Sequence, residues 1–592
     1  MTRSHAPLTA FVLLIVPLFL SACDPSSGSA GTEGGTAEAH GHSHDHAHDT
    51  LPSATPSAYP DRMVLSWADD PASTLSVTWR TDSTVTDAKA QIAPARAAPS
   101  FYTAARTVDA TTQTLPDTAA DGQPTTAKYH AVTFEDLEAD SLYAYRVGDG
   151  EHWSEWVHAE TAAAEPEPFS FLYVGDAQNN VRSHWSRLIR QAYADAPDVS
   201  FAIHAGDLVN NAHRNLEWGH WNAAGGFIQS MVPTLAVPGN HEYGGVRRWR
   251  ARDTFDVEVT ASGTEMTGTI IEPDGNPEPL EATSDDASPD AAAYPAGTWD
   301  YNVDNGEYVG TLRIEQGSPE YTATMVSEDG TEIPLRDVSV DGTTLTGTFL
   351  MEVEKESAET LSVHWRPQFE LPRNGPEGLK ETVYYVDHQG MRLIGLNSEP
   401  ATVDADVRAT QTEWLRSVLN EAANDPEIRW TVAAFHHPLF SSGEGRSNEA
   451  LREAWRPLFD KYNVDLVLQG HDHTYARGRS ENLEQGVNTR SPTGGTVYVN
   501  SVSGAKMYEV KPDRWSDFEG IEMERGGENT QLYQVVRVRQ DTLQYRSYTA
   551  TGAPYDAFDL VRQDDGPSTM IERPPAAAEE RTHENTLDYT RP

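Results

Sequence analysis

The spacing of hydrophobic and polar positions changes several times along this chain, and the first regular pattern lies between 57 and 163. Short segments such as MVLSWADD, TLSVTWRT and KYHAVTFEDL alternate apolar with polar residues and are separated by turn-forming residues. Alternation with a period of two is typical of strands with one buried face. The pattern predicts a small all-β sandwich over 57–163, which we expect to position or dock other parts of the chain.

Continuous apolar runs replace this alternation from 166 onward. The runs FSFLYVGD, VSFAIHAGD, PTLAVPGNH, RWTVAAFHHP and VDLVLQGHDH have helix-like stretches between them. Strands that are apolar at every position are typical of parallel sheets buried on both faces. The pattern predicts an α/β domain in two parts, 166–254 and 362–562, with a largely parallel sheet. Strand-like pieces after 475 are candidates for a second, mixed sheet over the first.

A long interruption separates the two parts of the α/β domain. Segments such as GTWDYNV and EYVGTLRIEQG alternate like β-hairpins with glycine turns, which predicts an inserted β domain over 255–361. At the end of the chain, residues 563–592 are rich in Glu, Pro, Ala and Arg. This composition predicts a disordered tail.

The first 22 residues are typical of an export signal. A short apolar run, LTAFVLLIVPLFLSA, follows Arg3 and is too short to span a bilayer comfortably, which predicts a signal peptide over 1–22. The run ends in Leu20-Ser21-Ala22-Cys23, which resembles the bacterial lipoprotein lipobox and holds the chain's only cysteine. The resemblance implies cleavage before Cys23, acylation of its thiol, and an exported lipoprotein anchored to a membrane, periplasmic or at the cell surface. A plain secretory signal with an incidental cysteine is the alternative.

Residues 23–56 predict a flexible tether, because they are rich in small and polar residues and have no periodic apolar pattern. Within the tether, five histidines alternate with small or acidic residues: His40, His42, His44, His46 and His48. Such a tract can gather zinc or similar ions loosely, and a merely solvated linker is the alternative.

Composition and charge narrow the classes of function. The chain has 592 residues, which predicts two to four domains, and 38% of them are hydrophobic. With 44 basic against 90 acidic residues, the formal net charge of −46 repels nucleic acids, so we expect no nucleic-acid partner. A single cysteine excludes intrachain disulfides and cysteine clusters for zinc.

Residues that can bind metal follow each of the five apolar strands. In chain order they are Asp176, Asp207, Asn240 with His241, His436 with His437, and His471 with His473. Ligands gather at the carboxyl ends of strands in open α/β sheets, so we expect these side chains to converge in one cleft. Carboxylate, amide oxygen and imidazole together suit hard or borderline divalent ions. A lone strand-end Asp is more often a helix cap and a lone buried His a core residue, but five strand ends of this kind indicate a shared site.

The motifs Gly175-Asp176, Gly206-Asp207, Gly239-Asn240-His241-Glu242, His436 before Pro438, and Gly470-His471-Asp472-His473 occur in this order. Together they resemble the calcineurin-like metallophosphoesterases. The preceding sandwich and the His-x-Pro motif are most similar to the purple acid phosphatases, and DLEADSLYAYRVGDG resembles a fibronectin type III pattern. The resemblance implies a metallophosphoesterase sandwich, two sheets flanked by helices, after a fibronectin type III-like domain.

The resemblance also implies a role for each motif residue. Asp176, Asp207 and His473 would hold one metal ion, with Asp207 bridging to a second ion that is completed by Asn240, His436 and His471. Divalent zinc, manganese or iron are the candidate ions. The implied mechanism is attack on phosphorus by a metal-bound hydroxide. His241 would face the phosphate and assist the leaving group.

Two departures from the family pattern bear on the substrate. The family places a Tyr where this chain has Asn210, which leaves Asn210 as a candidate ligand for metal or substrate. The family also places a substrate His soon after the His-x-Pro motif, and the segment LFSSGEGRSNEALREAW has none. Glu444 and Arg446 are the candidate substrate residues in its place.

These observations predict an acid phosphatase-like enzyme that hydrolyses small phosphate monoesters at a dinuclear metal centre. A phosphodiesterase or nucleotide pyrophosphatase is the enzymatic alternative, because the same metal site serves those reactions. A surface metal-binding or adhesive lipoprotein is the alternative of another class, suggested by the His-rich tether and the inserted β domain.

Overall fold

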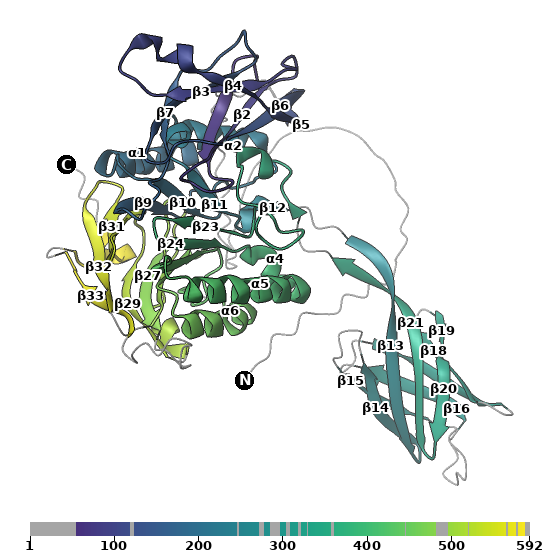
Figure 1. Cartoon of the computed structure of the whole chain (residues 1–592). Helices are drawn as coiled ribbons and strands as arrows, with labels where there is room; N and C mark the ends of the chain where they lie inside the picture. The colour runs from purple at the N-terminus through teal and green to yellow at the C-terminus, as the bar shows by residue number, and fades with distance from the viewer. Residues whose placement is uncertain are drawn as a thin grey trace, which may run out of the picture. The chain divides into compact units, whose positions relative to one another are not determined.

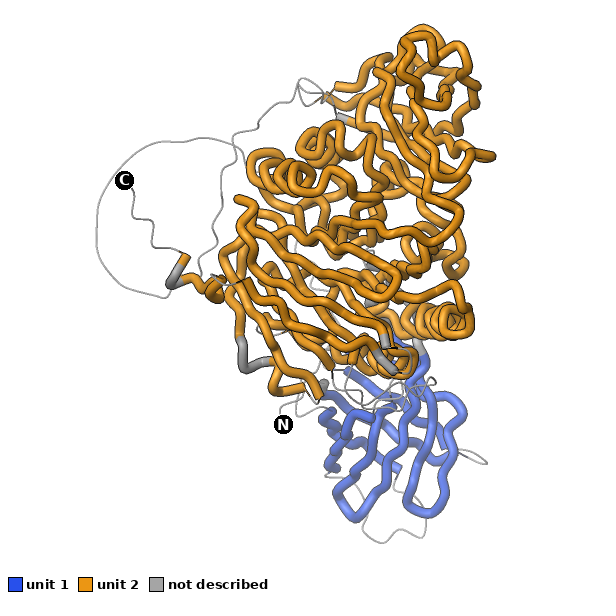
Figure 2. Tube along the Cα trace, turned by 60° about the vertical axis from the view of Figure 1, so that its left-hand side comes forward, with its two compact units in different colours: residues 1–40, 246–357 blue, residues 41–245, 358–592 orange. Residues whose placement is uncertain are grey.

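The computed structural model describes residues 55–118, 123–244, 248–271, 277–284, 296–303, 308–317, 321–327, 330–356, 360–443, 446–480, 495–518, 520–563, 566–575 and 578–586. These residues form two compact units, which we call the inserted unit, within 246–357, and the core unit, within 41–245 and 358–592 (Figure 2). The predicted signal peptide, Cys23, the His-rich tether up to residue 54 and Glu444 lie outside the described residues.

The core unit begins with the predicted all-β sandwich. One sheet has the order β1-β2-β6-β5 and the other β4-β3-β7-β8, and all neighbouring strands are antiparallel. The strands are β1 (Asp61–Ser66), β2 (Leu75–Asp82), β3 (Lys89–Pro94), β4 (Arg106–Asp109), β5 (Thr111–Thr118), β6 (Pro124–Phe134), β7 (Leu142–Gly148) and β8 (Val157–Glu160). Alternate apolar residues such as Val77 and Trp79 fill the interior, as the period of two predicts.

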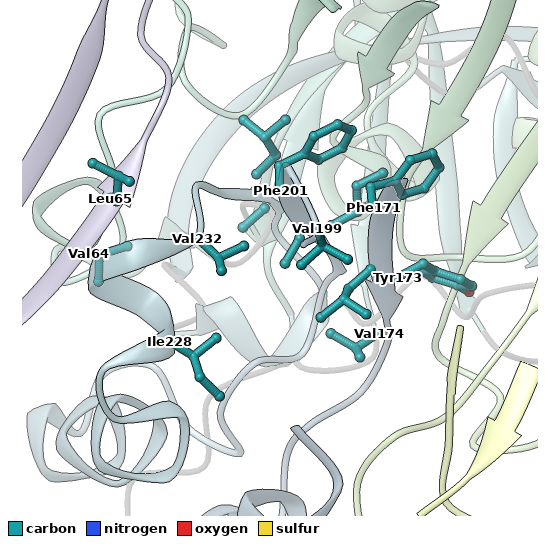
Figure 3. Close-up of a cluster of buried hydrophobic side chains, with 14 of the residues drawn as sticks. Val64, Leu65, Phe171, Tyr173, Val174, Val199, Phe201, Ile228 and Val232 are labelled. Carbon is teal, nitrogen blue, oxygen red and sulfur yellow. The ribbon is translucent and has the colours of Figure 1, made fainter. Parts of the chain in front are cut away.

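The sandwich shares a hydrophobic core with the domain that follows it. Val64 and Leu65 of β1 belong to the same buried cluster as Ile228 and Val232 (Figure 3). Hydrogen bonds reinforce this contact, because the Tyr145 hydroxyl donates to the Ser230 carbonyl at 2.6 Å. The sandwich is therefore packed firmly against the α/β domain.

The α/β domain consists of two seven-stranded sheets. The first has the order β11-β10-β9-β30-β31-β32-β33 and the second β23-β24-β25-β26-β28-β27-β29. The strands of the first are β11 (Thr234–Val237), β10 (Phe201–Ala205), β9 (Phe169–Val174), β30 (Leu532–Val538), β31 (Thr542–Thr549), β32 (Pro554–Gln563) and β33 (Gly566–Glu572). Those of the second are β23 (Tyr384–His388), β24 (Met391–Gly395), β25 (Trp430–Ala434), β26 (Leu466–Gln469), β28 (Val497–Asn500), β27 (Tyr475–Ser480) and β29 (Ile521–Gly527).

This arrangement corrects the prediction that the five apolar strands form one largely parallel sheet. The strands β9, β10 and β11 are parallel neighbours in the first sheet, whereas β25 and β26 are parallel neighbours in the second. On its other edge β9 pairs antiparallel with β30, far along the chain. The first sheet thus has its parallel strands at one edge and antiparallel strands beyond β9, whereas the second has a parallel centre between antiparallel strands. Two mixed sheets of this kind are the metallophosphoesterase sandwich that the family resemblance implies.

Helices cover the outer faces of both sheets (Figure 1). They are α1 (Ser186–Asp195), α2 (Asn215–Gly225), α3 (Ile228–Met231), α4 (Ser398–Val403), α5 (Ala405–Asn424) and α6 (Glu449–Tyr462). The α1 residues Leu188 and Ile189 pack in the core of the first sheet, and α5 and α6 contribute Leu415 and Trp455 to the core of the second. Within the described part of the chain, no helix is both long and apolar enough to cross a membrane.

The inserted unit is a nine-stranded antiparallel sheet of order β19-β18-β17-β16-β15-β14-β13-β21-β20. Its strands are β13 (Arg248–Ser262), β14 (Glu265–Ile271), β15 (Pro277–Thr283), β16 (Gly297–Val303), β17 (Tyr308–Gln316), β18 (Tyr321–Ser327), β19 (Glu332–Pro334), β20 (Arg336–Asp341) and β21 (Thr344–Glu356). The unit begins before the predicted boundary at 255, because β13 starts at Arg248. It ends before 361, because β22 (Thr360–Leu361) pairs with β12 (Tyr243–Gly244) in the core unit.

The prediction of a disordered tail over 563–592 is wrong for part of that segment. Strand β33 pairs antiparallel with β32, and the Ser568 hydroxyl donates to a carboxylate oxygen of Asp465 at 2.8 Å. A short helix, α7 (His583–Thr586), follows. The composition of the tail did not indicate β33, because the strand is supported mainly by pairing with the neighbouring sheet edge and few of its residues, such as Met570, pack against the core.

Candidate metal centre

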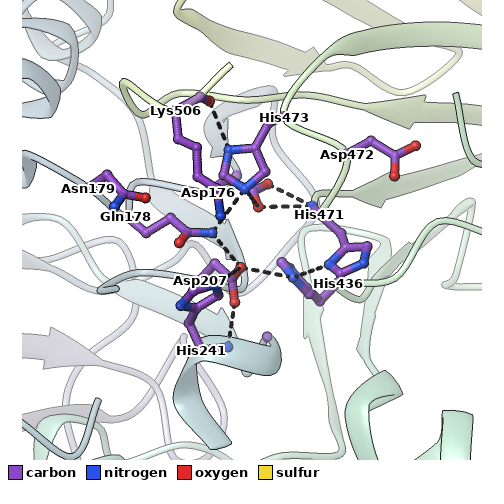
Figure 4. Close-up of polar contacts among 12 residues, drawn as sticks. Asp176, Gln178, Asn179, Asp207, His241, His436, His471, Asp472, His473 and Lys506 are labelled. Atoms are coloured by element: carbon purple, nitrogen blue, oxygen red, sulfur yellow. Dashed lines mark hydrogen bonds and ion pairs between the residues drawn. The ribbon is translucent and has the colours of Figure 1, made fainter. Parts of the chain in front are cut away.

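The loops after five strands bring the predicted ligand residues together (Figure 4). Asp176 follows β9, Asp207 follows β10, Asn240 follows β11, His436 follows β25, and His471 and His473 follow β26. The three residues Asp176, Asp207 and His473 form one cluster, in which ligand atoms lie within 4.8 Å of one another. Asp207, His436 and His471 form a second cluster of the same kind. Asp207 is common to both.

Asn240 joins the second cluster through its side-chain oxygen. Asn240 Oδ1 lies 3.1 Å from His436 Nε2 and 3.0 Å from His471 Nδ1. His436 Nε2 lies 3.2 Å from Asp207 Oδ2 as well. Four donor atoms from four loops therefore face one another across short distances.

Backbone partners orient the histidine rings. His436 Nδ1 donates to the Ala205 carbonyl at 2.9 Å, and His473 Nδ1 donates to the Lys506 carbonyl at 2.8 Å. Each bond leaves Nε2 with its lone pair directed into the cluster, which is how metal-binding histidines are commonly held.

The ligand loops adopt an uncommon backbone conformation. Positive φ angles occur at Asp176 (47°), Asp207 (53°), His471 (76°) and His473 (51°). Such angles cost on the order of 1–3 kcal/mol each in non-glycine residues and persist where the surroundings impose them. The adjacent glycines are needed for close approach: a Cβ on Gly206 would lie 2.6 Å from His436 Nδ1.

Buried charge makes this site suitable for cations. Asp176 is fully buried, and burial raises its pKa to about 7, with the positive charge of His436 opposing the rise and Asp207 adding to it. Burial lowers the pKa of His436, but Asp207 and Asp176 outweigh burial and raise it to about 10. Two carboxylates and three imidazoles so close together repel or demand protons unless a positive charge sits among them. The donor set therefore fits a metal centre.

His241 lies at the edge of the centre. Its backbone N–H donates to Asp207 Oδ1 at 2.9 Å, and its Nδ1 donates to the Asn210 carbonyl at 2.6 Å. His241 Nε2 is 3.9 Å from Asp207 Oδ2, and the side chain is 24% exposed. The ring is thus fixed beside the clusters without belonging to either.

Several residues that support the centre were missed by sequence reasoning. Glu242 is fully buried and accepts the backbone N–H groups of Asp207 and Gly239, both at 2.8 Å. Asp472 accepts from the Ser441 hydroxyl and the Ser442 N–H. Their place within the Gly-Asn-His-Glu and Gly-His-Asp-His motifs was a usable signal, because a buried acid beside a ligand has to be paired.

Gln178 and Lys506 carried no sequence signal of this kind. The Gln178 amide nitrogen lies 2.6 Å from Asp207 Oδ2 and 3.0 Å from His473 Nε2. Lys506 belongs to the loop after β28, and its side chain runs toward the Gln178 amide (Figure 4). Lys506 Nζ lies 5.5 Å from the centre of the Tyr508 ring, which in turn is 4.9 Å from the ring of His473. Within the described ranges, the Lys506 ammonium makes no hydrogen bond or ion pair.

The candidate substrate residues have distinct positions. Arg446 donates to the His471 carbonyl at 2.5 Å and lies 3.2 Å from Asp472, so it contacts a ligand loop. The Asn210 side chain accepts from the Asn179 amide at 3.0 Å rather than from a cluster residue. His437 bonds to Ser398 at 2.9 Å and pairs with Glu399 at 3.3 Å, which holds its ring nitrogens away from both clusters.

Two family models match the chain. The model of the purple acid phosphatase N-terminal domain matches residues 60–161. The calcineurin-like phosphoesterase model matches residues 169–301 and 355–475. The stretch between its two segments lies within the inserted unit.

Curated relatives match shorter stretches. An uncharacterised protein of Mycobacterium tuberculosis is 39% identical over 139 residues, which cover 22% of this chain and 26% of the relative. Purple acid phosphatase 15 of Arabidopsis thaliana is 32% identical over 130 residues, which cover 21% of this chain and 23% of the relative. The match spans about a quarter of the length of these relatives.

Solved structures show the fold over most of the chain. The purple acid phosphatase PPD1 from yellow lupin (Lupinus luteus) seeds superposes with a TM-score of 0.54 at 16% identity, covering 86% of this chain and 75% of that one. The structure of PhoD superposes with a TM-score of 0.50 at 11% identity, covering 90% of this chain and 96% of that one. The two-sheet architecture is therefore shared with both.

Proposed function

Because this chain is a calcineurin-like metallophosphoesterase close to the purple acid phosphatases, we propose that it hydrolyses phosphate monoesters at a centre of two metal ions. One observation carries the proposal: the carboxylate of Asp207 belongs to both ligand clusters. A carboxylate shared in this way can bridge two cations, and paired cations suit in-line displacement at phosphorus.

The donor set divides between the two ions. Asp176, Asp207 and His473 would hold the first, and Asp207 with Asn240, His436 and His471 would hold the second. Zinc, manganese and divalent iron suit this mixture of imidazole and oxygen donors. When bound, such ions lower the pKa of water and neutralise phosphate oxygens.

The protein's own side chains would bind the substrate and move the proton. His241 Nδ1 donates its proton to the Asn210 carbonyl, so in the imidazolium form the second proton is on Nε2, from which it would pass to the departing alkoxide and leave a neutral ring. The ammonium of Lys506 lies beside the first cluster. Among the described residues it has no carboxylate partner. In a chain with a formal charge of −46, this cation would attract the anionic ester to the site. Arg446 would hold the loop of His471 in place.

A substrate comparison tests the proposal. Purified protein is first analysed for metal and then assayed with p-nitrophenyl phosphate and with bis(p-nitrophenyl) phosphate. We expect two ions per chain and a larger kcat/KM for the monoester. A larger kcat/KM for the diester would favour a phosphodiesterase or nucleotide pyrophosphatase. Metal binding without hydrolysis of either ester would favour a passive metal-binding lipoprotein.

The nature of Asn210 also bears on the metal. The visible colour of purple acid phosphatases comes from a tyrosine phenolate bound to ferric iron, and this chain has a neutral amide at that position. We expect active protein to be colourless and to favour two divalent ions, since it lacks an anionic ligand that stabilises a trivalent one. A strong visible band in the iron-loaded protein would contradict this expectation.

The lipid anchor at Cys23 is a further part of the proposal, and it is supported by the sequence pattern of residues 20–23. Acylation there would hold the enzyme at a membrane by its tether. Labelling with a fatty acid and fractionation of Cys23→Ser protein provide the test. We expect label in the parent protein and release of the variant, and retention of the variant at the membrane would exclude the anchor.

A further inference from the structure

Gln178 occupies a place in the first cluster that corresponds to the place of Asn240 in the second. Gln178 is fully buried, two residues after Asp176, and its backbone N–H donates to the Asp207 carbonyl at 3.0 Å. Its side-chain amide lies between Asp207 and His473 (Figure 4). The site would thus have one amide side chain in each cluster.

The distances around the two amides are similar. One atom of the Gln178 amide lies 2.6 Å from Asp207 Oδ2 and 3.0 Å from His473 Nε2. The corresponding distances from Asn240 Oδ1 to its two histidine neighbours are 3.1 and 3.0 Å. Atoms bound to one ion at about 2.0–2.2 Å are themselves about 3 Å apart. Gln178 therefore stands at the distance of a ligand from its neighbours.

Only one of the two polar atoms of the Gln178 amide has hydrogen-bond partners among the described residues. Its nitrogen donates to two lone pairs, on Asp207 and His473, that converge on one point. Its oxygen, Oε1, is buried and has no hydrogen-bond partner among the described residues. A buried carbonyl without a partner costs free energy. Rotating the amide by half a turn exchanges the two atoms and turns the oxygen toward the cluster, where a cation would attract it.

We propose that Gln178 binds the first metal ion through its side-chain oxygen. This inference rests on the proposed dinuclear centre. It gives each ion four protein ligands: Asp176, Asp207, His473 and Gln178 for the first, and Asp207, Asn240, His436 and His471 for the second. The Asn210 side chain, which is hydrogen-bonded to Asn179, is not needed as a ligand.

A different role for Gln178 would be to orient Asp207 by donating an N–H. The variants Gln178→Leu and Gln178→Glu separate the two roles, because both remove the N–H and only Glu keeps an oxygen. If Gln178 binds metal, the Leu variant should bind the first ion more weakly and the Glu variant should retain it. If Gln178 only orients Asp207, both variants should lose affinity for the first ion to a similar extent.

The measurement is metal content and affinity in the full-length protein. Each protein is loaded with Zn²⁺, dialysed against graded chelator and analysed for metal, and the Co²⁺-loaded form is recorded in the visible range. We expect two ions in the parent protein. In Gln178→Leu we expect one ion and at least a ~100-fold weaker first site, the upper end of the effect of losing an outer partner. In Gln178→Glu we expect two ions and an altered Co²⁺ spectrum.

Asn179→Ala is the matched control, because Asn179 is the next residue and bonds to Asn210 instead of to a cluster residue. It should keep two ions. Equal unfolding temperatures of the metal-free proteins would show that the variants fold. Two tightly bound ions in Gln178→Leu, or equal losses in the Leu and Glu variants, would overturn the inference. Fewer than two ions in the parent protein would instead refute the dinuclear centre itself.

Discussion

The core unit and the inserted unit differ in what they bury. The described interior of the inserted unit is apolar apart from Ser284, with residues such as Trp299 and Leu312 at its centre. The core unit buries carboxylates and imidazoles, among them Asp176, Asp207 and His436. All 21 histidines of the chain lie outside 246–357.

This difference shows where the chemistry lies. A buried ionisable group costs free energy unless it is paired, and a buried cluster of such groups with metal-ligand chemistry is typical of a functional site. The described part of the inserted unit is one antiparallel sheet with an apolar interior, whereas the core unit contains ligand loops with positive φ angles and clustered charge. We therefore place the proposed metal binding and hydrolysis in the core unit.

The largest effect is expected from Asp207→Ala. This change removes the one carboxylate common to both clusters, so the binding of both ions should be weakened together. We expect hydrolysis to fall below the residual level that follows loss of a single general acid, which typically costs about 10²–10⁴ in rate. Rates and metal content of the variant provide the check. A mild loss, equal to that of His241→Ala, would contradict the shared role of Asp207.

A smaller loss of activity is expected from His241→Ala. The side chain stands beside the clusters, so the variant should keep its metal and lose about 10²–10⁴ in kcat. The loss should shrink for esters with good leaving groups, which need no proton. His152→Ala, which alters a similarly exposed histidine of the sandwich (29% against 24%), is the control. If the His241 variant lost metal instead, the ring would have to be placed among the ligands.

Acid should affect the core unit more than the inserted unit. Burial is the main cause that lowers the pKa of His204 and His388 to about 3 and of His130 and His364 to about 4. In the unfolded chain these rings have pKa values near 6.5. Their contribution to the free energy of unfolding is therefore fully present above that pH, and it is lost as the pH falls toward the lower pKa values of the folded state. At pH 5 the loss is on the order of 1–2 kcal/mol per histidine.

Calorimetry at pH 7 and pH 5 tests this expectation. The transition that corresponds to the core unit should move to lower temperature more than the transition of the inserted unit, which has no histidine. An equal shift of both transitions would show that buried histidines do not decide the acid response.

The smallest effect on activity and metal content is expected from removing the inserted unit. Strands β12 and β22, which flank it, are antiparallel partners, with Tyr243 opposite Leu361. A short turn joining residues 245 and 358 should therefore preserve the core unit. We expect kcat and metal content within a few-fold of those of the full chain. A large rise in KM would show that the inserted unit helps to bind substrate.

The sequence predicted the position of the centre better than its surroundings. Motif residues such as Asp176 and His473 follow recognisable apolar strands, so their convergence could be predicted from strand direction. Gln178 and Lys506 could not be identified, because a single amide or lysine has no pattern and its role depends on what folds against it. The pairing of β9 with β30 could not be predicted either, since an apolar run does not reveal its neighbours.

The pairing of β9 with β30 has a consequence for the order in which the chain folds. Phe171 lies opposite Val536, so the centre of the first sheet closes only after nearly the whole chain is present. All nine strands of the inserted unit, in contrast, are contiguous in sequence and precede that closure. Long-range contacts are slow to form because the loop between them must first be closed. During synthesis the inserted unit can therefore fold early, whereas the sheet that positions Asp176 and Asp207 is completed only when the C-terminal strands are present.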